Sequence, residues 1–256
     1  MSNEDRRKQI LSLISDEGYV SVTDLARSLF ISEPTVRRDL AALEKEGSIR
    51  RTHGGASFIE NGPNFWPLNM RNKVNLREKE YVGRLAAGLI KENDHIFIDT
   101  GSTDFCLAKA LEPSMQLTVA TNGLPIAMLL ASQPTKTVEC CGGFYDARDS
   151  AFYGEDTLEF IRKRRARYFF VSTGSMDAQY GASGFDSKGI ASKHAFSENA
   201  ETTVLLMDHT KEDKVSYYQV FTWDQIDILI TDRRPGDELM EACRQHRVQV
   251  LYGPGE

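Results

Sequence analysis

From about Leu76 to the end of the chain, short apolar segments alternate with segments whose apolar residues have helical spacing. The apolar segments have the length of β-strands, and they are His95–Asp99, Leu117–Thr121, Thr137–Cys141, Tyr168–Ser172, Thr203–Asp208, Ile226–Thr231 and Val248–Tyr252. The clearest helical patterns are Glu78–Lys91 and Asp237–Gln245. Strands that alternate with helices form a mostly parallel sheet with helices on both faces. This part of the chain is therefore predicted to have an α/β fold.

The N-terminal part has a different pattern, which predicts three helices followed by two short strands. The first helix ends at Gly18, and Ser21 and Ser32 are placed to cap the second and third helices. The strands Ser48–Thr52 and Ala56–Ile59 flank a turn rich in glycine. Three helices with a two-stranded wing form a winged helix-turn-helix.

The 256 residues are enough for one small and one medium-sized domain. We expect the winged helix-turn-helix over residues 1–58, a linker over residues 59–75 and the α/β domain over residues 76–256. The linker is predicted because the segment Asn61–Pro67 breaks every regular spacing with its prolines and glycine.

The charge of the chain excludes a protein that coats nucleic acid without selectivity. The formal net charge is −6, and residues 1–57 hold nine basic and nine acidic residues. Any DNA binding must therefore come from local clustering of arginines. Arg37 and Arg38 are adjacent on the third predicted helix, and Arg50 and Arg51 are adjacent in the wing.

The arginines of the third helix are placed to read DNA. The N-terminal part of that helix reaches base edges in a helix-turn-helix, and an arginine can bind guanine through two hydrogen bonds. The alternative is that these arginines pair with carboxylates on a solvated helix face. The candidate DNA-binding residues are Ser32, Thr35, Arg37, Arg38, Arg50, Arg51 and His53.

A second group of polar and glycine residues follows the predicted strands. Open α/β sheets bind ligands at the carboxyl ends of their strands, and the segment Asp99–Thr103 offers amide groups and hydroxyls to an anion. Strand-to-helix turns favour the same residue types without any ligand. The candidate effector-binding residues are Asp99, Gly101, Ser102, Thr103, Thr121, Asn122, Gly142, Gly143, Lys193 and Lys211.

Other classes of protein are not expected. The four cysteines form no C-x-x-C pair and have no histidines at metal-ligand spacing, so we expect buried free thiols, no metal and no cofactor. No apolar run approaches the roughly 18 residues of a membrane helix, and the charged N-terminus has no signal-like core. We expect a cytoplasmic protein without membrane contact.

The residues of both sites resemble the DeoR family of bacterial transcriptional regulators over nearly the whole chain. The segments that carry the resemblance are Val36–Leu40, Arg51–Ala56, Asp99–Thr103, Thr121–Asn122, Gly142–Gly143, Asp208–Lys211 and Ile230–Asp232. The resemblance implies a repressor of sugar operons that assembles as a dimer or a larger homo-oligomer, such as a tetramer. It also implies a C-terminal domain similar to ribose-phosphate isomerases and CoA transferases, which senses a phosphorylated sugar and has lost catalysis.

The chain departs from the family pattern in one segment. The family usually carries a glutamate where this chain has Lys188 and Gly189, whereas Lys193 and His194 are retained. The related isomerases need an acidic base there, so its absence argues against an enzyme. The extra lysine predicts a more anionic ligand. Ser102 stands where the family more often has threonine.

Three functions are compatible with these observations. The favoured one is a transcriptional regulator that binds double-stranded operator DNA and responds to a phosphorylated sugar. The second is an isomerase or acyl-CoA-transfer enzyme, for which Asp99 and Asp232 are the candidate bases. The third is a sugar-phosphate binding protein whose winged helix contacts another protein.

Overall fold

The computed structural model describes residues 3–17, 19–45, 49–51, 54–58, 68–72 and 74–253. The chain divides into two compact units, residues 1–74 and 75–256. Within the described ranges, no helix has both the length and the apolar character needed to span a bilayer.

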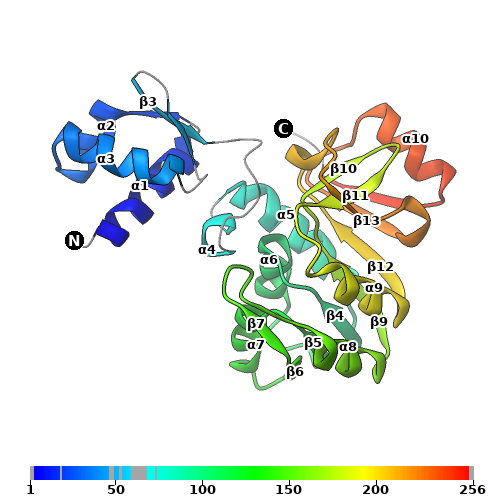
Figure 1. The fold of residues 1–256 in the computed structure, drawn as a ribbon. Helices are drawn as coiled ribbons and strands as arrows, with labels where there is room; N and C mark the ends of the chain where they lie inside the picture. The colour runs from blue at the N-terminus through cyan, green and yellow to red at the C-terminus, as the bar shows by residue number, and fades with distance from the viewer. Residues whose placement is uncertain are drawn as a thin grey trace. The chain divides into compact units, whose positions relative to one another are not determined.

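The described residues of the first unit up to Phe58 form three helices and a small antiparallel sheet (Figure 1). Its elements are α1 (Asn3–Glu17), β1 (Tyr19–Ser21), α2 (Val22–Leu29), α3 (Glu33–Lys45), β2 (Ile49–Arg51) and β3 (Gly55–Phe58). The strands lie in the order β1-β3-β2. This arrangement confirms the winged helix-turn-helix. Strand β1 was not predicted, because three residues are too few to show a period.

Local sequence determines how α2 and α3 begin. The Ser21 side chain accepts a hydrogen bond of 3.0 Å from the backbone N–H of Asp24, as expected for an N-cap. Ser32 begins α3 through its carbonyl oxygen, which accepts from the N–H of Val36 at 3.1 Å. The apolar faces of the helices form one buried core, which contains Ile10, Ile14, Leu25, Val36, Leu40 and Leu43.

The segment 59–75, expected as a linker, contains the short helix α4 (Leu68–Arg71). Residues 59–67 and 73 of that segment lie outside the described residues. Asn75 belongs to the second unit.

The second unit is built on a seven-stranded sheet in which every pair of neighbours is parallel, which confirms the α/β fold class. The strand order is β15-β14-β12-β9-β4-β5-β6. In chain order the strands are β4 (His95–Ile98), β5 (Leu117–Thr121), β6 (Lys136–Cys140), β9 (Ala166–Val171), β12 (Ala200–Leu206), β14 (Ile228–Thr231) and β15 (Gln249–Tyr252).

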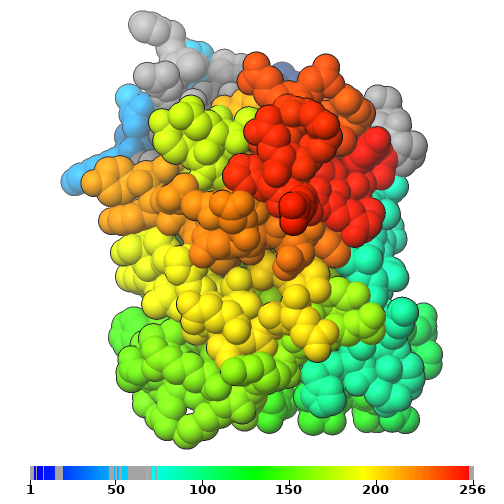
Figure 2. Space-filling model, turned by 90° about the vertical axis from the view of Figure 1, so that its right-hand side faces the viewer, coloured from blue at the N-terminus to red at the C-terminus, as the bar shows by residue number. Residues whose placement is uncertain are grey.

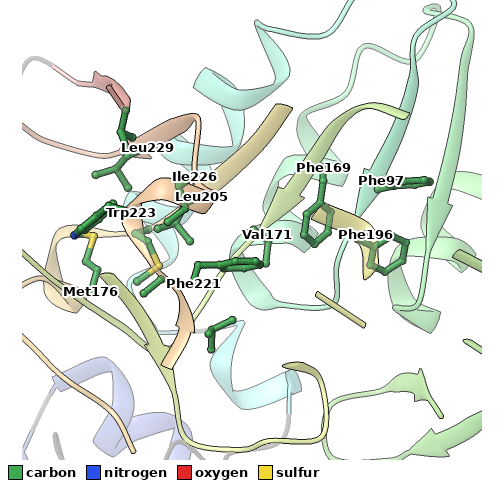
Figure 3. Close-up of a cluster of buried hydrophobic side chains, with 14 of the residues drawn as sticks. Phe97, Phe169, Val171, Met176, Phe196, Leu205, Phe221, Trp223, Ile226 and Leu229 are labelled. Atoms are coloured by element: carbon green, nitrogen blue, oxygen red, sulfur yellow. The ribbon is translucent and has the colours of Figure 1, made fainter. Parts of the chain in front are cut away.

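Helices cover both faces of this sheet. They are α5 (Leu76–Ala87), α6 (Ser102–Ala110), α7 (Leu124–Ala131), α8 (Glu155–Arg162), α9 (Ile190–Glu198) and α10 (Asp237–Gln245). Residues of α5, α6 and α7 form one core cluster with Ile96 and Ile98 of β4. Residues of α8, α9 and α10 form the other core cluster with Phe97 (Figure 3). Phe97 belongs to the same strand β4 but points to the opposite face of the sheet. In Figure 2, the orange-red atoms of α10 lie at the surface of the second unit.

Two antiparallel additions to the second unit were not predicted. One is the hairpin of β7 (Phe144–Asp146) and β8 (Ala151–Tyr153). The other is a three-stranded sheet of β10 (Ser175–Asp177), β11 (Gly181–Gly184) and β13 (Tyr218–Phe221), in the order β10-β11-β13. Two 3-10 helices, η1 (His209–Lys211) and η2 (Trp223–Gln225), complete the unit.

Two expectations about the second unit were wrong in detail, and one of its strands was not expected. The segment Gly181–Gly184 is a buried strand, which pairs with β10 just before it in the chain and with β13, which comes much later. The helix expected over Glu78–Lys91 ends at Ala87, where Gly88 caps it. Cys140 is exposed, whereas the other three free cysteines are buried.

The contact between α5 and α6 depends on Gly83. A Cβ atom at this position would lie 2.7 Å from the backbone carbon of Cys106 and 2.8 Å from the backbone nitrogen of Leu107. Backbone atoms cannot move aside as a flexible side chain can, so Gly83→Ala is expected to destabilise the second unit by about 2–3 kcal/mol. Chemical denaturation measures this loss. Gly142→Ala is the matched control, because a Cβ there would meet no atom within 4 Å. Equal stability of the two variants would contradict the close approach.

Candidate functional site

The exposed face of α3 presents the two arginines that were expected to read DNA. Both side chains are exposed. Arg37 lies 3.5 Å from Glu33, one helical turn earlier. Arg38 contacts the carbonyl oxygen of Pro34 at 3.4 Å and the hydroxyl of Thr35 at 3.5 Å, and it forms no ion pair within the described residues. The alternative of paired arginines therefore applies to Arg37 and not to Arg38.

The hydroxyls expected beside these arginines lie at the start of the same helix. Ser32 and Thr35 share a hydrogen bond of 2.9 Å between their side-chain oxygens. Ser32 is exposed and Thr35 is half-buried. Each hydroxyl can still form a further hydrogen bond, since a hydroxyl has one donor and two acceptor positions.

A buried ion pair fixes the opposite side of α3. Asp39 is 3% exposed and accepts hydrogen bonds from Arg6 of α1 at 2.6 and 3.1 Å. Arg7 approaches the same carboxylate at 3.4 Å. Asp39 is also the carboxylate that directly follows Arg38 in the sequence of α3. It binds the arginines of α1 instead, which leaves Arg38 without that carboxylate.

The wing residues are only partly described. Arg51 donates a backbone hydrogen bond of 3.0 Å to Glu44 and forms an ion pair of 2.9 Å with the same carboxylate. Arg50 is described only as a residue of β2. His53, also proposed as a DNA contact, lies outside the described residues.

In the second unit, the carboxyl ends of β4 and β9 bring a lysine and a carboxylate together. Asp99 follows β4 and is 1% exposed, and it forms an ion pair with Lys193 of α9. The Lys193 ammonium group also donates to the carbonyl oxygen of Ser172 at 3.2 Å. The two partners lie 94 positions apart in the chain. Two of the predicted effector-binding residues are thus direct neighbours.

A second carboxylate, which was not predicted, lies in the first turn of α6. Asp104 is fully buried and accepts a hydrogen bond from the Ser172 hydroxyl. Its other carboxylate oxygen has no partner within the described part of the chain. A Cβ atom at Gly101 would overlap the Asp104 carboxylate and lie 2.5 Å from the Ser172 hydroxyl. Gly101 is therefore required by this contact, whether or not a ligand is bound.

The neighbouring strand β5 contributes a buried amide. Asn122 follows this strand and is fully buried, and neither atom of its side-chain amide has a partner among the described residues. Thr121 accepts a hydrogen bond of 3.0 Å from the N–H of Gly123, so its hydroxyl shapes the turn. Ser102 and Thr103 are buried at the start of α6. Because buried polar groups normally have partners, the free amide of Asn122 points to a ligand.

The hairpin β7–β8 is joined to the same edge of the sheet. The Thr100 hydroxyl donates to the carbonyl oxygen of Asp149 at 3.0 Å, and the N–H of Phe152 donates to the carbonyl oxygen of Asn122 at 2.9 Å. Asp146 of β7 forms an ion pair of 2.7 Å with Lys188. The extra lysine is therefore held by a carboxylate, and its bonded partner raises its pKa.

The predicted pair Gly142 and Gly143 leads into this hairpin. The Gly142 carbonyl oxygen accepts a hydrogen bond of 2.6 Å from the Thr157 hydroxyl. Gly143 has a φ of 128°, and a Cβ atom there would lie 2.5 Å from the carbonyl oxygen of Tyr153. The turn requires glycine at position 143 for its conformation.

A separate polar cluster follows β12 and β14. Asp232 accepts hydrogen bonds from the backbone and ring nitrogens of His209 at 2.6 and 2.7 Å. Asp208 accepts from Thr210 and from Asn75, the latter at 3.3 Å. Lys211 is half-buried in η1, beside this cluster. Because β9 lies between β4 and β12, the strand that precedes Lys211 lies about 10 Å from β4, which precedes Asp99.

Two residues of the Asp99 cluster, Ser172 and Asp104, are not among the predicted effector-binding residues, although both lie at or close after the end of a predicted strand. Ser172 comes directly after the strand β9, and Asp104 lies five positions after Asp99 in the loop and helix that follow β4. The polar run Ser172–Gly174 resembles the other strand ends and was a usable signal. Asp104 gave none, since acidic residues are common in the first turn of a helix.

Burial and the charge of Asp99 raise the pKa of Asp104 to about 7, against the smaller opposing effects of Lys193 and of the Ser172 hydrogen bond. An aspartate that is protonated in the folded state and ionised in the unfolded state makes folding take up a proton. The free energy of unfolding should therefore fall as the pH rises from about 4 to about 7, and this contribution should be constant above that range. In that range the wild type should lose more than about 1 kcal/mol of unfolding free energy per pH unit through Asp104. Asp104→Asn should not show this loss.

Denaturation of the wild type and of Asp104→Asn at pH 5, 6, 7 and 8 measures this effect as a difference between the two proteins. Titrating groups that do not interact with Asp104 are shared by the two proteins and cancel. Parallel profiles for the two proteins would contradict a protonated Asp104.

Comparison with known proteins gives consistent matches over most of the chain. The family model of the DeoR C terminal sensor domain matches residues 74–233, and that of the DeoR-like helix-turn-helix domain matches residues 6–61. The HTH-type transcriptional regulator GolR of Listeria innocua is 33% identical over 90% of this chain and 91% of its own length. The glycerol-3-phosphate regulon repressor of Escherichia coli is 30% identical over 98% of this chain and 99% of its own length.

A third relative is the lactose phosphotransferase system repressor of Lactococcus lactis, which is 30% identical over 96% of this chain and 97% of its own length. Solved structures are more distant. Ribose 5 phosphate isomerase A from Neisseria gonorrhoeae has a TM-score of 0.38 and 15% identity over 56% of this chain and 54% of its own. The sorbitol operon regulator SorC from Klebsiella pneumoniae has a TM-score of 0.39 and 12% identity over 98% of this chain and 97% of its own.

Proposed function

Because the chain belongs to the DeoR family of transcriptional regulators, we propose that it represses a carbohydrate operon by binding operator DNA through α3 and the wing. A phosphorylated sugar or related intermediate, bound at the carboxyl edge of the parallel sheet, controls this binding. Relatives whose names state that they repress the glycerol-3-phosphate regulon or the lactose phosphotransferase system support the sugar-related role. Two or more copies reading paired half-sites suit a helix-turn-helix protein.

One observation carries the DNA-binding part of this proposal. Arg38 is exposed on α3, and the carboxylate next to it, Asp39, is turned to the opposite side and engaged by Arg6 and Arg7. An arginine in this position can contact a guanine without first breaking an ion pair. Arg37, Ser32 and Thr35 lie on the same part of the helix and suit neighbouring bases or phosphates.

The effector-binding part rests on the buried amide of Asn122 and on the cluster around Lys193. A ligand with hydroxyls can satisfy both atoms of the Asn122 amide and the free oxygen of Asp104. Lys193 pairs with Asp99 and lowers the pKa of Asp104, and the start of α6 adds the positive end of a helix dipole. These features support a small polar ligand that carries both hydroxyls and an anionic group.

The enzyme hypothesis has less support. Its two candidate bases are Asp99 and Asp232, and each is bound to a basic side chain, Lys193 or His209. A carboxylate held in this way is a weaker base than a free one. We therefore propose that the second unit senses its ligand and does not convert it.

The proposed reading of DNA predicts a large effect for Arg38→Ala. The wild-type protein is first used to enrich a binding sequence from a random duplex library, and the enriched DNA is called the selected duplex below. The variant should bind the selected duplex more weakly by about 1–3 kcal/mol, which is roughly 5- to 150-fold, and it should lose its preference at one base pair. Fluorescence anisotropy at fixed salt measures both.

Arg244→Ala is the matched control, because Arg244 is an equally accessible helical arginine of the second unit. It should bind the selected duplex like the wild type. If Arg38→Ala binds as tightly as this control, α3 does not read the DNA through Arg38.

A further inference from the structure

Phe30, between α2 and α3, is unusual in two independent ways. Its side chain is 95% exposed, and no other large apolar side chain among the residues described for the first unit is exposed. Its backbone also has φ 55° and ψ 42°, in the left-handed region. Bulky residues rarely adopt this conformation, because their Cβ atom approaches the following carbonyl oxygen.

The conformation itself has a structural reason. Phe30 ends α2, and the N–H of the next residue, Ile31, donates to the carbonyl oxygen of Ala26 at 3.1 Å. Ile31 then packs against the core of the unit. This is the usual way in which a helix ends with a left-handed residue, and glycine is the residue that fits it best. The turn explains the backbone of Phe30 but gives no reason for its side chain.

The surroundings of Phe30 suit an anionic partner. Arg27 and Ser28 are exposed just before it, with the Arg27 guanidinium 3.5 Å from the Asp24 carboxylate, and the exposed Ser32 lies two positions after it at the start of α3. Two residues of chain span at most about 7 Å, so Phe30 lies close to the end of α3 that carries Thr35. If this end of α3 enters the major groove of a duplex, the sugar–phosphate backbone on one side of the groove lies beside the turn that contains Phe30.

We propose that Phe30 is a DNA-contact residue whose ring packs on the deoxyribose surface of the sugar–phosphate wall beside α3. This inference rests on the proposed function, because it requires that α3 enters a groove. The left-handed backbone holds the ring away from the core, and a phenylalanine has only two side-chain torsions to fix on binding. Arg27 and the two serines then lie beside the ring and face the neighbouring phosphates.

The contact has a signature that separates it from the arginine contacts. A phenyl ring releases no counterions, so its loss should leave the slope of log Kd against log salt unchanged. Deoxyribose carries no base identity, so the loss of affinity should be similar for the selected duplex and for a duplex with changed bases. Arg38→Ala, in contrast, changes base preference.

The test variant is Phe30→Gly in the full-length protein. Glycine relieves the left-handed strain, so the melting temperature of the first unit should rise by roughly 2–5 °C. Affinity for the selected duplex should nevertheless fall roughly 5- to 20-fold. Phe30→Tyr should retain wild-type affinity. Tyr217→Ala, which removes an aromatic side chain that is 86% exposed in the second unit, should leave DNA binding unchanged.

Phe30→Gly that binds the selected duplex as tightly as the wild type would overturn the inference while the proposed function stands. A loss of affinity that coincides with a lower oligomer mass in light scattering would also overturn it, because Phe30 would then contact a second copy of the chain. If the wild type enriches no duplex at all, the proposed function fails, and the contact of Phe30 fails with it.

Discussion

Lys193→Met is expected to destabilise the second unit by about 3–5 kcal/mol, because it leaves the buried carboxylate of Asp99 without its cation. Asp99 and Asp104 are 1% and 0% exposed, and Lys193 is the partner of the first and lowers the pKa of the second. Methionine keeps the length of the side chain, so the loss reports on charge and not on packing. Urea denaturation of the second unit measures it.

A second variant shows whether the loss comes from unpaired charge. Lys193→Met combined with Asp99→Asn removes both members of the ion pair and should recover most of the stability lost in the single variant. The double variant should still fail to respond to any sugar phosphate that the wild type binds. Equal instability of the single and double variants would show that Lys193 acts through packing.

Asp39→Ala is expected to destabilise the first unit by about 2–4 kcal/mol and to weaken binding to the selected duplex. Asp39 is the buried link between α3 and α1, and its loss leaves Arg6, whose side chain is only 14% exposed, without its carboxylate. The position of α3 relative to α1 then loses its buried ion pair. Thermal unfolding of the first unit and anisotropy with the selected duplex give the two values.

Glu33→Ala is the matched control for this prediction. It removes an exposed carboxylate from the same helix, at 3.5 Å from Arg37, and should change stability by less than about 1 kcal/mol. If Asp39→Ala is no more harmful than Glu33→Ala, the buried ion pair does not stabilise the first unit.

The sequence predicted those features that depend on near neighbours in the chain. Ser21 caps α2 as expected, and the helical spacing of Val36, Leu40 and Leu43 identified the buried face of α3. The apolar segments of the parallel sheet were recognised because a strand that is buried on both faces is a nearly continuous apolar run. Helix α10 has the bounds that its spacing predicted.

Features that depend on distant parts of the chain were not predicted. The partner of Asp39 lies 33 positions away, and that of Asp99 lies 94 positions away. Strand β11 was not predicted, because its glycines and serine favour turns, whereas its pairing with β10 and with the distant β13 decides its structure. Gly101 and Gly143 were taken for ligand contacts, although close approach and a positive φ explain them without a ligand.

The effector site was predicted as an anion cradle of hydroxyls and amide groups. The structure adds the buried carboxylate of Asp104 to it and shows that two predicted residues, Asp99 and Lys193, form an ion pair. A spacing argument could not supply this, because the charge of the site depends on which side chains α6 and α9 turn toward each other. Because two acidic side chains accompany one lysine, we expect the site to recognise the hydroxyl groups of its ligand as much as the phosphate.

A titration of the complex between the wild-type protein and the selected duplex with sugar phosphates links the two units in one measurement. The proposed function predicts that at least one sugar phosphate changes the Kd for the duplex by roughly tenfold or more, and that its unphosphorylated form does so far less. It also predicts that the variant Lys193→Met with Asp99→Asn binds the duplex but no longer responds. An unchanged Kd across a panel of triose, pentose and hexose phosphates would contradict control by a phosphorylated sugar.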